Sequence, residues 1–301
     1  MVSFERHHSL TSGGEFMRTT PLHPEFGVEV HDLDLRAVTA DNGYPLIRAA
    51  FEEHSLLLFR GQNLDDDEHL AFARLFGPLE DRGDRPTQTI GALTNLRDDG
   101  TLAPEQDLKT RNLKANQLWH TDSTFLPIPA LANVLQARVV TSRGGETEFV
   151  STRAGWRALD PGLKERARNA VLRHRYAHSR AQIDAEVANQ PHVTKWNEQA
   201  WRAVWPNPAS GAEALYIASH AYAVEGMGDP EGKALIDTLT AAMTTQDAIY
   251  THRWRPGDVV VWDERATLHR GRPWPYDEQR TLISVCVTAS ESDGLASVRP
   301  G

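Results

Sequence analysis

Cysteine is almost absent from this sequence, since its 301 residues include only one, Cys286. A single cysteine excludes an internal disulfide and a cysteine-rich zinc module, and it is typical of a reducing compartment, so we expect a cytoplasmic protein. Long apolar runs are also lacking, because none approaches the roughly 20 residues that span a bilayer. The first 20 residues have no continuous apolar segment and therefore do not resemble a secretory signal.

Basic residues are in deficit, because 32 Lys and Arg stand against 41 Asp and Glu, a formal net charge of −9. This balance disfavours binding to nucleic acid or to an anionic membrane, since both need a basic surface. Repeats and low-complexity segments are absent as well. With 40% hydrophobic and 24% charged residues, the chain has the composition of a globular protein that buries a large core.

The organisation of the chain follows from its patterns. Residues 1–17 are polar and punctuated by Gly and Ser, which indicates a leader that is disordered or derived from an expression vector. We expect residues 18–301 to form one domain, because no change in composition marks a linker. Apolar spacing predicts a helix over 44–54, and carboxylates at 65–67 mark the start of another. Many short β-type runs predict a mainly β fold with helical elaborations, an antiparallel barrel or jelly roll.

Two segments show no clear periodicity. Residues 97–112 are polar, contain Gly100 and Pro104, and are predicted to form a surface loop. Residues 176–212 contain three tryptophans. A loop-rich insertion that covers a pocket would explain this segment, although ordinary packing explains any single tryptophan.

His120 and Asp122 form the first candidate site. Residues i and i+2 of a strand point to the same face, so an imidazole nitrogen and a carboxylate oxygen can converge on one metal ion. About one His-x-Asp pair arises by chance in a chain with 13 His and this acidic content. A simple hydrogen bond between the two side chains explains the pair equally well.

A distant histidine, His269, completes a ligand set. Alone it would be an ordinary core or surface residue. With His120 and Asp122 it provides two imidazoles and one carboxylate, the facial triad that leaves three coordination positions open for Fe(II) and O₂ chemistry. A zinc hydrolase uses more imidazole or thiolate ligands and fewer open positions, so the set favours iron over zinc.

Arg280 follows His269 across a connection that contains Gly271, Pro273 and Pro275. Adjacent antiparallel strands would bring its guanidinium near the metal without coordinating it. An arginine there can bind the far carboxylate of a dicarboxylate co-substrate through paired hydrogen bonds. A surface arginine at the start of a strand is the alternative interpretation.

Several motifs in a fixed order give the chain a specific resemblance. They are FGVEV at 26–30, LFRGQ at 58–62, AFARLFGPL at 71–79, NQLWHTDSTF at 116–125, GGETEF at 144–149, WD at 262–263, LHRGR at 268–272 and then Arg280. Together they resemble the taurine dioxygenase and 2,4-dichlorophenoxyacetate dioxygenase family of Fe(II)/2-oxoglutarate-dependent oxygenases. The resemblance covers the chain from about residue 22 to 288.

This resemblance implies a double-stranded β-helix, which is the jelly roll. It assigns His120, Asp122 and His269 to Fe(II), and Thr147 with Arg280 to the distal carboxylate of 2-oxoglutarate. The implied reaction consumes O₂ and 2-oxoglutarate, releases succinate and CO₂, and hydroxylates a small, anionic organic substrate. Where the hydroxylated carbon carries an ether oxygen or another heteroatom, the product breaks apart.

The resemblance also implies two substrate contacts, Asn116 and His220. An asparagine in this setting more often makes only a local hydrogen bond. One departure matters, because Ser284 stands where close relatives carry a second arginine that faces the substrate anion. Taurine is therefore a doubtful substrate, and a carboxylate would need another anchor. Residues that could supply it are Arg82, Arg85, Lys114, His220 and Arg272.

Two other functions stay open at this point. One is a non-haem iron oxygenase or metal hydrolase that does not use 2-oxoglutarate, which would have no need for Thr147 with Arg280. The other is a non-catalytic jelly-roll protein that binds a small acid, which does not explain a complete triad. Retention of Asp122 argues against the halogenase branch, where loss of the carboxylate leaves room for chloride. The expected partner is a small molecule, and homo-oligomerisation is left open.

Overall fold

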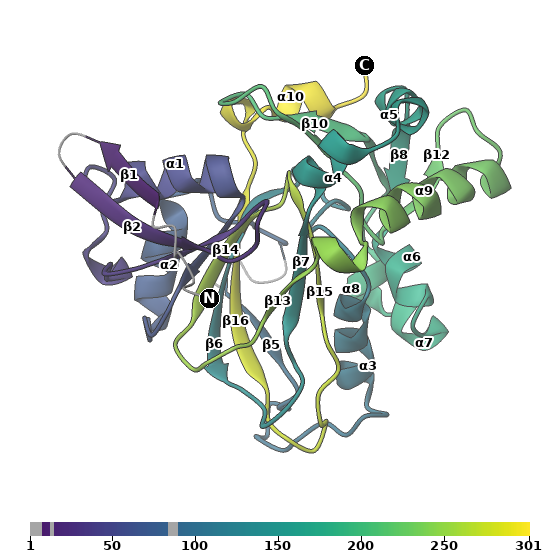
Figure 1. Cartoon of the computed structure of the whole chain (residues 1–301). Helices are drawn as coiled ribbons and strands as arrows, with labels where there is room; N and C mark the ends of the chain where they lie inside the picture. Colours follow the sequence, from purple (N-terminus) through teal and green to yellow (C-terminus); the bar gives the residue numbers. More distant parts are fainter. Residues whose placement is uncertain (1–7, 13–14, 84–89) are drawn as a thin grey trace.

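The computed structural model describes residues 8–12, 15–83 and 90–301. Two β-sheets face each other at its centre, and helices lie on their outer sides (Figure 1). The strands of the large sheet are β1 (His8–Ser12), β2 (Glu15–Pro21), β3 (Val28–Val30), β4 (Leu56–Phe59), β5 (Gly91–Thr94), β6 (Ala130–Val139), β14 (Val259–Asp263) and β16 (Thr281–Thr288). The small sheet consists of β7 (Thr147–Ser151), β13 (Tyr250–His252) and β15 (Thr267–Gly271).

The large sheet has the strand order β1-β2-β3-β4-β14-β6-β16-β5, and the small sheet has the order β13-β7-β15. Among the described residues, β3 and β4 are the one parallel pair in these sheets. Two facing, mainly antiparallel sheets are the architecture of a jelly roll. The predicted fold class, mainly β with helical elaborations, is therefore confirmed.

Ten α-helices and two peripheral sheets surround this centre in the described part of the chain. The helices are α1 (Tyr44–His54), α2 (Asp66–Arg74), α3 (Leu108–Lys114), α4 (Thr152–Ala158), α5 (Pro161–Arg168), α6 (Tyr176–Ala181), α7 (Ala185–Ala188), α8 (Pro191–Thr194), α9 (Asp229–Met243) and α10 (Leu295–Val298). One of these two peripheral sheets consists of β12 (Ala221–Val224), β8 (Val171–His174) and β9 (Gln199–Arg202). The other consists of β10 (Val204–Pro206) and β11 (Glu213–Leu215). None of the helices described is both long and apolar enough to cross a membrane.

Alternate side chains of the central strands belong to different layers of the core. Leu135 and Val260 pack between the two sheets, where they meet Phe149 of β7. Their neighbours Val134 and Val261 belong instead to the cluster that α1 and α2 cover. Because successive side chains of a strand point to opposite faces, both faces of the large sheet are buried. The functional site lies between the sheets.

Local sequence explains where the first helices begin. The predicted helix over 44–54 is confirmed as α1, which buries Leu46 and Phe51 on its apolar face. Asp65 caps α2 by accepting a hydrogen bond from the Glu68 amide, and the Glu68 carboxylate accepts one from the Asp65 amide in return. This reciprocal pair satisfies amides at the helix start that have no partner within the helix.

Strand β2 runs from Glu15 to Pro21 and crosses the boundary at residue 17 between the predicted leader and the predicted domain. Met17 is buried, at 3% exposure, and β2 pairs with β3. Strand β1 lies within the same predicted leader and pairs with β2. The division of the chain into a leader and one domain stays a prediction.

The predicted surface loop over 97–112 is wrong at its C-terminal end. Helix α3 begins at Leu108, capped by the Asp107 side chain, which accepts a hydrogen bond from the Lys109 amide. The helix buries only Thr110, so its sequence lacks the apolar period that would have revealed it. Residues 176–212 contain α6, α7 and α8, which pack on one another at one side of the small sheet (Figure 1).

Candidate metal centre and active site

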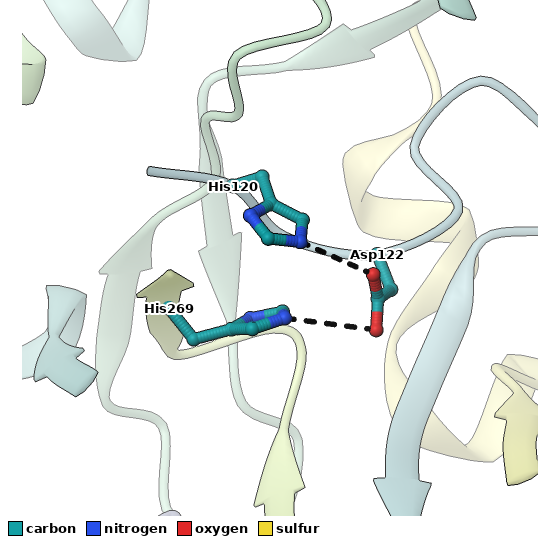
Figure 2. A group of neighbouring side chains, drawn as sticks. All are labelled: His120, Asp122 and His269. Carbon is teal, nitrogen blue, oxygen red and sulfur yellow. Dashed lines mark ion pairs between the residues drawn. The ribbon is translucent and has the colours of Figure 1, made fainter. Parts of the chain in front are cut away.

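His120, Asp122 and His269 come together beside β15, an edge strand of the small sheet (Figure 2). His120 and His269 form an isolated antiparallel bridge, in which each amide donates to the carbonyl of the other residue at 3.0 and 2.9 Å. The bridge places the two imidazoles side by side, with ring centroids 4.1 Å apart. The Asp122 carboxylate lies 3.6 Å from Nε2 of His120 and 3.8 Å from Nε2 of His269.

Hydrogen bonds orient the first two of these side chains. Nδ1 of His120 donates to the Leu118 carbonyl at 2.7 Å, which leaves a lone pair on Nε2, the nitrogen that faces Asp122. The Asn133 amide group donates to Asp122 Oδ2 at 2.7 Å. The Asp122 backbone amide donates to Glu264, whose side chain is buried. Such partners hold metal ligands in place before a metal binds.

The protonation states suit metal binding. Burial lowers the pKa of His269 to about 3 and also lowers the pKa of His120, so both rings are neutral at physiological pH. Burial favours the neutral form of Asp122, but the neighbouring His269 and His120 outweigh it and lower its pKa to about 2. The centre therefore presents two neutral nitrogens and one carboxylate, the ionisation states that a divalent metal requires.

These residues fit a mononuclear Fe(II) centre. Their three ligand atoms lie within 4.8 Å of one another. Nδ1 of His269 is buried without a hydrogen-bond partner in the described residues. Nε2 of the same ring faces Asp122 and is the nitrogen available to a metal ion. Two imidazoles and one carboxylate leave open positions for small ligands, which suits Fe(II) rather than a closed structural zinc site.

The centre opens into a cavity of about 360 Å³ between the two sheets. Thr147 and Arg280 line this cavity together with the three candidate ligands. Arg280 is 8% exposed, its Nη2 donates to the Gly145 carbonyl at 2.9 Å, and its amide donates to Asn95 Oδ1 at 2.9 Å. Burial lowers the pKa of Arg280 to about 10.

Thr147 presents a hydroxyl to the same cavity. Its Oγ1 accepts a hydrogen bond from Nε1 of Trp254 at 2.9 Å, so its own proton is free to donate to a ligand. Trp274 packs against the Arg280 guanidinium, which lies 5.0 Å from the ring centroid. A permanently charged fork and a hydroxyl donor therefore converge at this end of the cavity, an arrangement that suits a carboxylate.

Comparison with known proteins agrees with this geometry. A family model described as "Taurine catabolism dioxygenase TauD, TfdA family" matches residues 18–286. The chain belongs to this family. The alpha-ketoglutarate-dependent 2,4-dichlorophenoxyacetate dioxygenase of Cupriavidus pinatubonensis is 35% identical over 270 residues, covering 87% of this chain and 94% of that protein.

Two further relatives lie at a similar level. The (S)-phenoxypropionate/alpha-ketoglutarate-dioxygenase of Sphingobium herbicidovorans is 34% identical over 271 residues, covering 85% of this chain and 88% of that protein. The crystal structure of AAD-2 in complex with Mn(II) and N-oxalylglycine is similar with a TM-score of 0.86 at 31% identity, covering 91% of this chain and 98% of that chain. The predicted family, enzyme class and cofactors are confirmed: this TauD/TfdA protein is an Fe(II)- and 2-oxoglutarate-dependent dioxygenase.

The other residues predicted from the TauD/TfdA resemblance also reach the cavity. Asn116 is half-buried and His220 is 2% exposed, and both line it. Ser284 lines it as well, and its hydroxyl donates to Asn133 Oδ1 at 2.9 Å. The position that carries a second arginine in close relatives is thus a short, hydrogen-bonded hydroxyl here.

The suggested anchors for a substrate anion differ in position. Arg82 lines the cavity, but its guanidinium pairs with Glu80. Lys114 and Arg272 do not line it; they pair with Glu105 at 2.8 Å and with Glu148 at 3.6 Å, respectively. Arg85 lies outside the described residues.

Sequence reasoning missed three side chains at or next to the cavity of this TauD/TfdA member. Asn133 and Glu264 hold Asp122, and Arg180 lines the cavity from α6. Asn133 had a detectable signal, because it is the polar residue within the apolar first part of β6, residues 130–135. Arg180 had none, because its segment showed no periodicity.

A substitution at Gly145 tests how closely the Arg280 side chain packs against the backbone. The φ of Gly145 is +71°, and an added Cβ would lie 2.9 Å from Nε of Arg280. We expect Gly145→Ala to weaken 2-oxoglutarate binding, because the guanidinium must shift away from the cavity, and to lower the free energy of unfolding by about 1 kcal/mol. Gly211 has the same φ of +71° with nothing within 4 Å, so Gly211→Ala carries the backbone strain alone. Calorimetric titration that shows equal 2-oxoglutarate affinity for the two variants would contradict this expectation.

Proposed function

We propose that His120, Asp122 and His269 hold the Fe(II) of this dioxygenase, and that Arg280 with Thr147 binds the distal carboxylate of 2-oxoglutarate. The observation that carries the proposal is the convergence of both groups in one cavity. A facial triad alone would suit other iron enzymes, and a buried arginine alone would suit any acid binder. Their combination suits a keto acid that chelates the metal at one end and carries a second carboxylate at the other.

Each group has a separate task in this proposal. Asn133 and the Asp122 amide contact with Glu264 keep the carboxylate turned toward the two imidazoles. Arg280 and Thr147 orient the co-substrate along the cavity. His120, His269 and Arg280 are buried, which limits their contact with bulk water and thereby unproductive oxidation. When bound, Fe(II) supplies the redox chemistry by which O₂ and 2-oxoglutarate oxidise a C–H bond of the substrate, with release of succinate and CO₂.

The proposed substrate is a small organic anion. Named relatives act on 2,4-dichlorophenoxyacetate, on phenoxypropionate and, at 29% identity in a Pseudomonas putida protein, on a sulfate ester. The neutral imidazole of His220 and the amide of Asn116 are proposed to contact this substrate, since both line the cavity. Burial lowers the pKa of His220 well below its usual value, so it acts as a hydrogen-bonding group and not as a cation.

A spectroscopic experiment tests the co-substrate assignment. We expect anaerobic addition of Fe(II) and then 2-oxoglutarate to give a visible metal-to-ligand charge-transfer band, because chelation by a keto acid requires two adjacent open positions. Succinate is the matched control, since it has no keto oxygen, and it should give no band. Iron-loaded protein that binds 2-oxoglutarate without any such absorption would overturn the assignment.

Turnover then identifies the substrate class. Succinate formation is measured with aryloxyalkanoates, sulfate esters, sulfonates and amino-acid-like acids, each at fixed Fe(II), O₂ and 2-oxoglutarate. We propose that aryloxyalkanoates rank above taurine, because Ser284 has no charge to offer a sulfonate. A cytoplasmic location, the absence of a nucleic-acid partner and the oligomeric state stay predictions from the sequence.

A further inference from the structure

Four arginine side chains are buried in the described part of the chain: Arg153, Arg180, Arg265 and Arg280. Two have a carboxylate partner, since Arg265 donates to Asp263 at 2.8 Å and Arg153 lies 3.5 Å from the same side chain. For Arg180 and Arg280 no described carboxylate lies within 4.0 Å, and both line the cavity. A buried charge needs a counter-charge, so the position of these two indicates that ligands supply it.

The guanidinium of Arg180 is held by neutral groups. The side chain is 7% exposed, Nη1 donates to Ser179 Oγ at 3.0 Å, and Nη2 donates to the Tyr176 hydroxyl at 2.9 Å. Nε is buried and has no partner in the described residues. Because a guanidinium has five N–H donors, these two hydrogen bonds leave three unused. Burial lowers the pKa of Arg180, as expected for a cation without a counter-charge.

The cavity lining contains three other cations, Arg280, Arg82 and Lys109, of which Lys109 is only partly buried. Arg280 lies with Thr147 and Gly145, where the proposed function places the distal carboxylate of 2-oxoglutarate. Arg82 is half-exposed and is neutralised by Glu80. Arg180 lies on a different element, α6, and the groups that act on its charge include Tyr176 and the candidate iron ligand Asp122.

The wall beside Arg180 is aromatic. Tyr176 stacks on Phe125 with ring centroids 4.1 Å apart, and the Arg180 guanidinium carbon lies 4.1 Å from the Tyr176 ring centroid. Apolar side chains continue the lining of the cavity: Leu93, Leu113, Phe125, Leu135 and Leu282. This part of the cavity thus combines a buried guanidinium that has no carboxylate partner with an apolar surface, which is complementary to an organic acid with a hydrocarbon or aromatic body.

We propose that Arg180 binds the anionic group of the substrate and that Phe125 and Tyr176 contact its apolar body. This inference rests on the proposed function, because it assigns the second of the two buried cavity arginines that have no carboxylate partner once Arg280 is given to 2-oxoglutarate. It selects a residue that lies outside the anchors suggested by the sequence. None of those that the structure describes is an arginine that is both buried in the cavity and without a carboxylate.

Binding under anaerobic conditions tests the proposal. Protein loaded with Fe(II) and 2-oxoglutarate is titrated calorimetrically with 2,4-dichlorophenoxyacetate, with hexyl sulfate and with the neutral amide of the first acid. We expect the parent to prefer the acid over its amide, and Arg180→Met to bind the acid about 30-fold or more weakly, because a buried charge-assisted pair is lost. Arg180→Met should bind acid and amide alike, and Arg180→Lys should recover part of the preference.

Two controls separate this role from a structural one. Arg175 begins the same helix, but its side chain is 52% exposed and pairs with Glu198, so Arg175→Met should bind every ligand as the parent does. Without ligand, Arg180→Met should unfold at the same temperature as the parent or a higher one, because an unpaired buried charge destabilises the empty protein. The acid should raise the unfolding temperature of the parent and not that of Arg180→Met.

Three results would overturn the proposal. They are an unchanged preference for the acid in Arg180→Met, a lower unfolding temperature of this variant without ligand, and a parent that binds neither anion. Affinity for 2-oxoglutarate, measured in the same samples, should be equal in parent and variant. A parent protein that does not bind 2-oxoglutarate would instead contradict the proposed function, so failure of the proposal and failure of the proposed function are distinguishable.

Discussion

We expect His269→Ala to abolish Fe(II)-dependent turnover. His269 is the middle residue of β15 and its Nε2 lies 3.8 Å from Asp122, so its removal leaves two ligands that come from one short segment. Two ligands cannot define a face of an octahedral metal, and the affinity for Fe(II) should fall together with turnover. Iron content after anaerobic desalting and succinate formation are the measurements.

A buried histidine elsewhere provides the matched control. His69 on α2 is fully buried, and its Nε2 contacts the Val134 carbonyl at 2.9 Å. We expect His69→Gln to keep its iron and its turnover if it folds, since this side chain does not reach the cavity. Stoichiometric iron with undiminished turnover in folded His269→Ala would remove His269 from the metal centre.

The metal centre shows what a sequence pattern can and cannot predict. The spacing of His120 and Asp122 predicted a shared face, but the structure places them in a segment before β6 and not within a strand. What brings His269 to them is a single bridge with β15. Bridges of this kind depend on the whole arrangement of the sheets, so His269 was predictable as part of a set but not from its own surroundings.

Some helices around the site were predictable from the sequence and others were not. α1 was predictable because it buries a regular apolar face, and the start of α2 because carboxylates cap it. α3 was not, since it buries one residue and packs against the 3₁₀ turn Ala115–Gln117 and α7. Local propensity determines an element only where tertiary packing does not override it.

Arg180 illustrates a limit of a different kind. Its chemistry depends on what is missing, namely a carboxylate within reach, and a sequence does not reveal a missing contact. Arg280 was predicted from its place after His269 and from the family resemblance, yet its environment in the structure is similar: burial, neutral hydrogen-bond partners and a cavity wall. Uncompensated buried charge is unfavourable in the empty protein, so it is retained where a ligand completes it.

Arg280→Ala should weaken 2-oxoglutarate by roughly 30-fold or more while iron binding stays unchanged. The distal carboxylate would lose a charge-assisted, bidentate partner in a buried setting, and truncating one side of such a pair costs about 2–5 kcal/mol, where each 1.4 kcal/mol is about tenfold in affinity. Arg280→Lys should recover part of the loss, because an ammonium cannot reproduce the planar fork. Thr147→Val should cost less, about 1–3 kcal/mol, the value of one hydrogen bond to a charged group.

Anaerobic titration with 2-oxoglutarate at fixed Fe(II) orders these variants, with Arg272→Ala as the matched control. Arg272 is 46% exposed and lies 3.6 Å from Glu148, so its ion pair is worth at most about 1 kcal/mol and the co-substrate should bind as in the parent. Because Gly145 and Trp274 contact the Arg280 guanidinium, the unfolding temperature of each variant is measured alongside. If folded Arg280→Ala binds 2-oxoglutarate as tightly as the parent does, the carboxylate lies elsewhere in the cavity. Arg180 would then be the remaining buried cation in its described lining with no carboxylate partner.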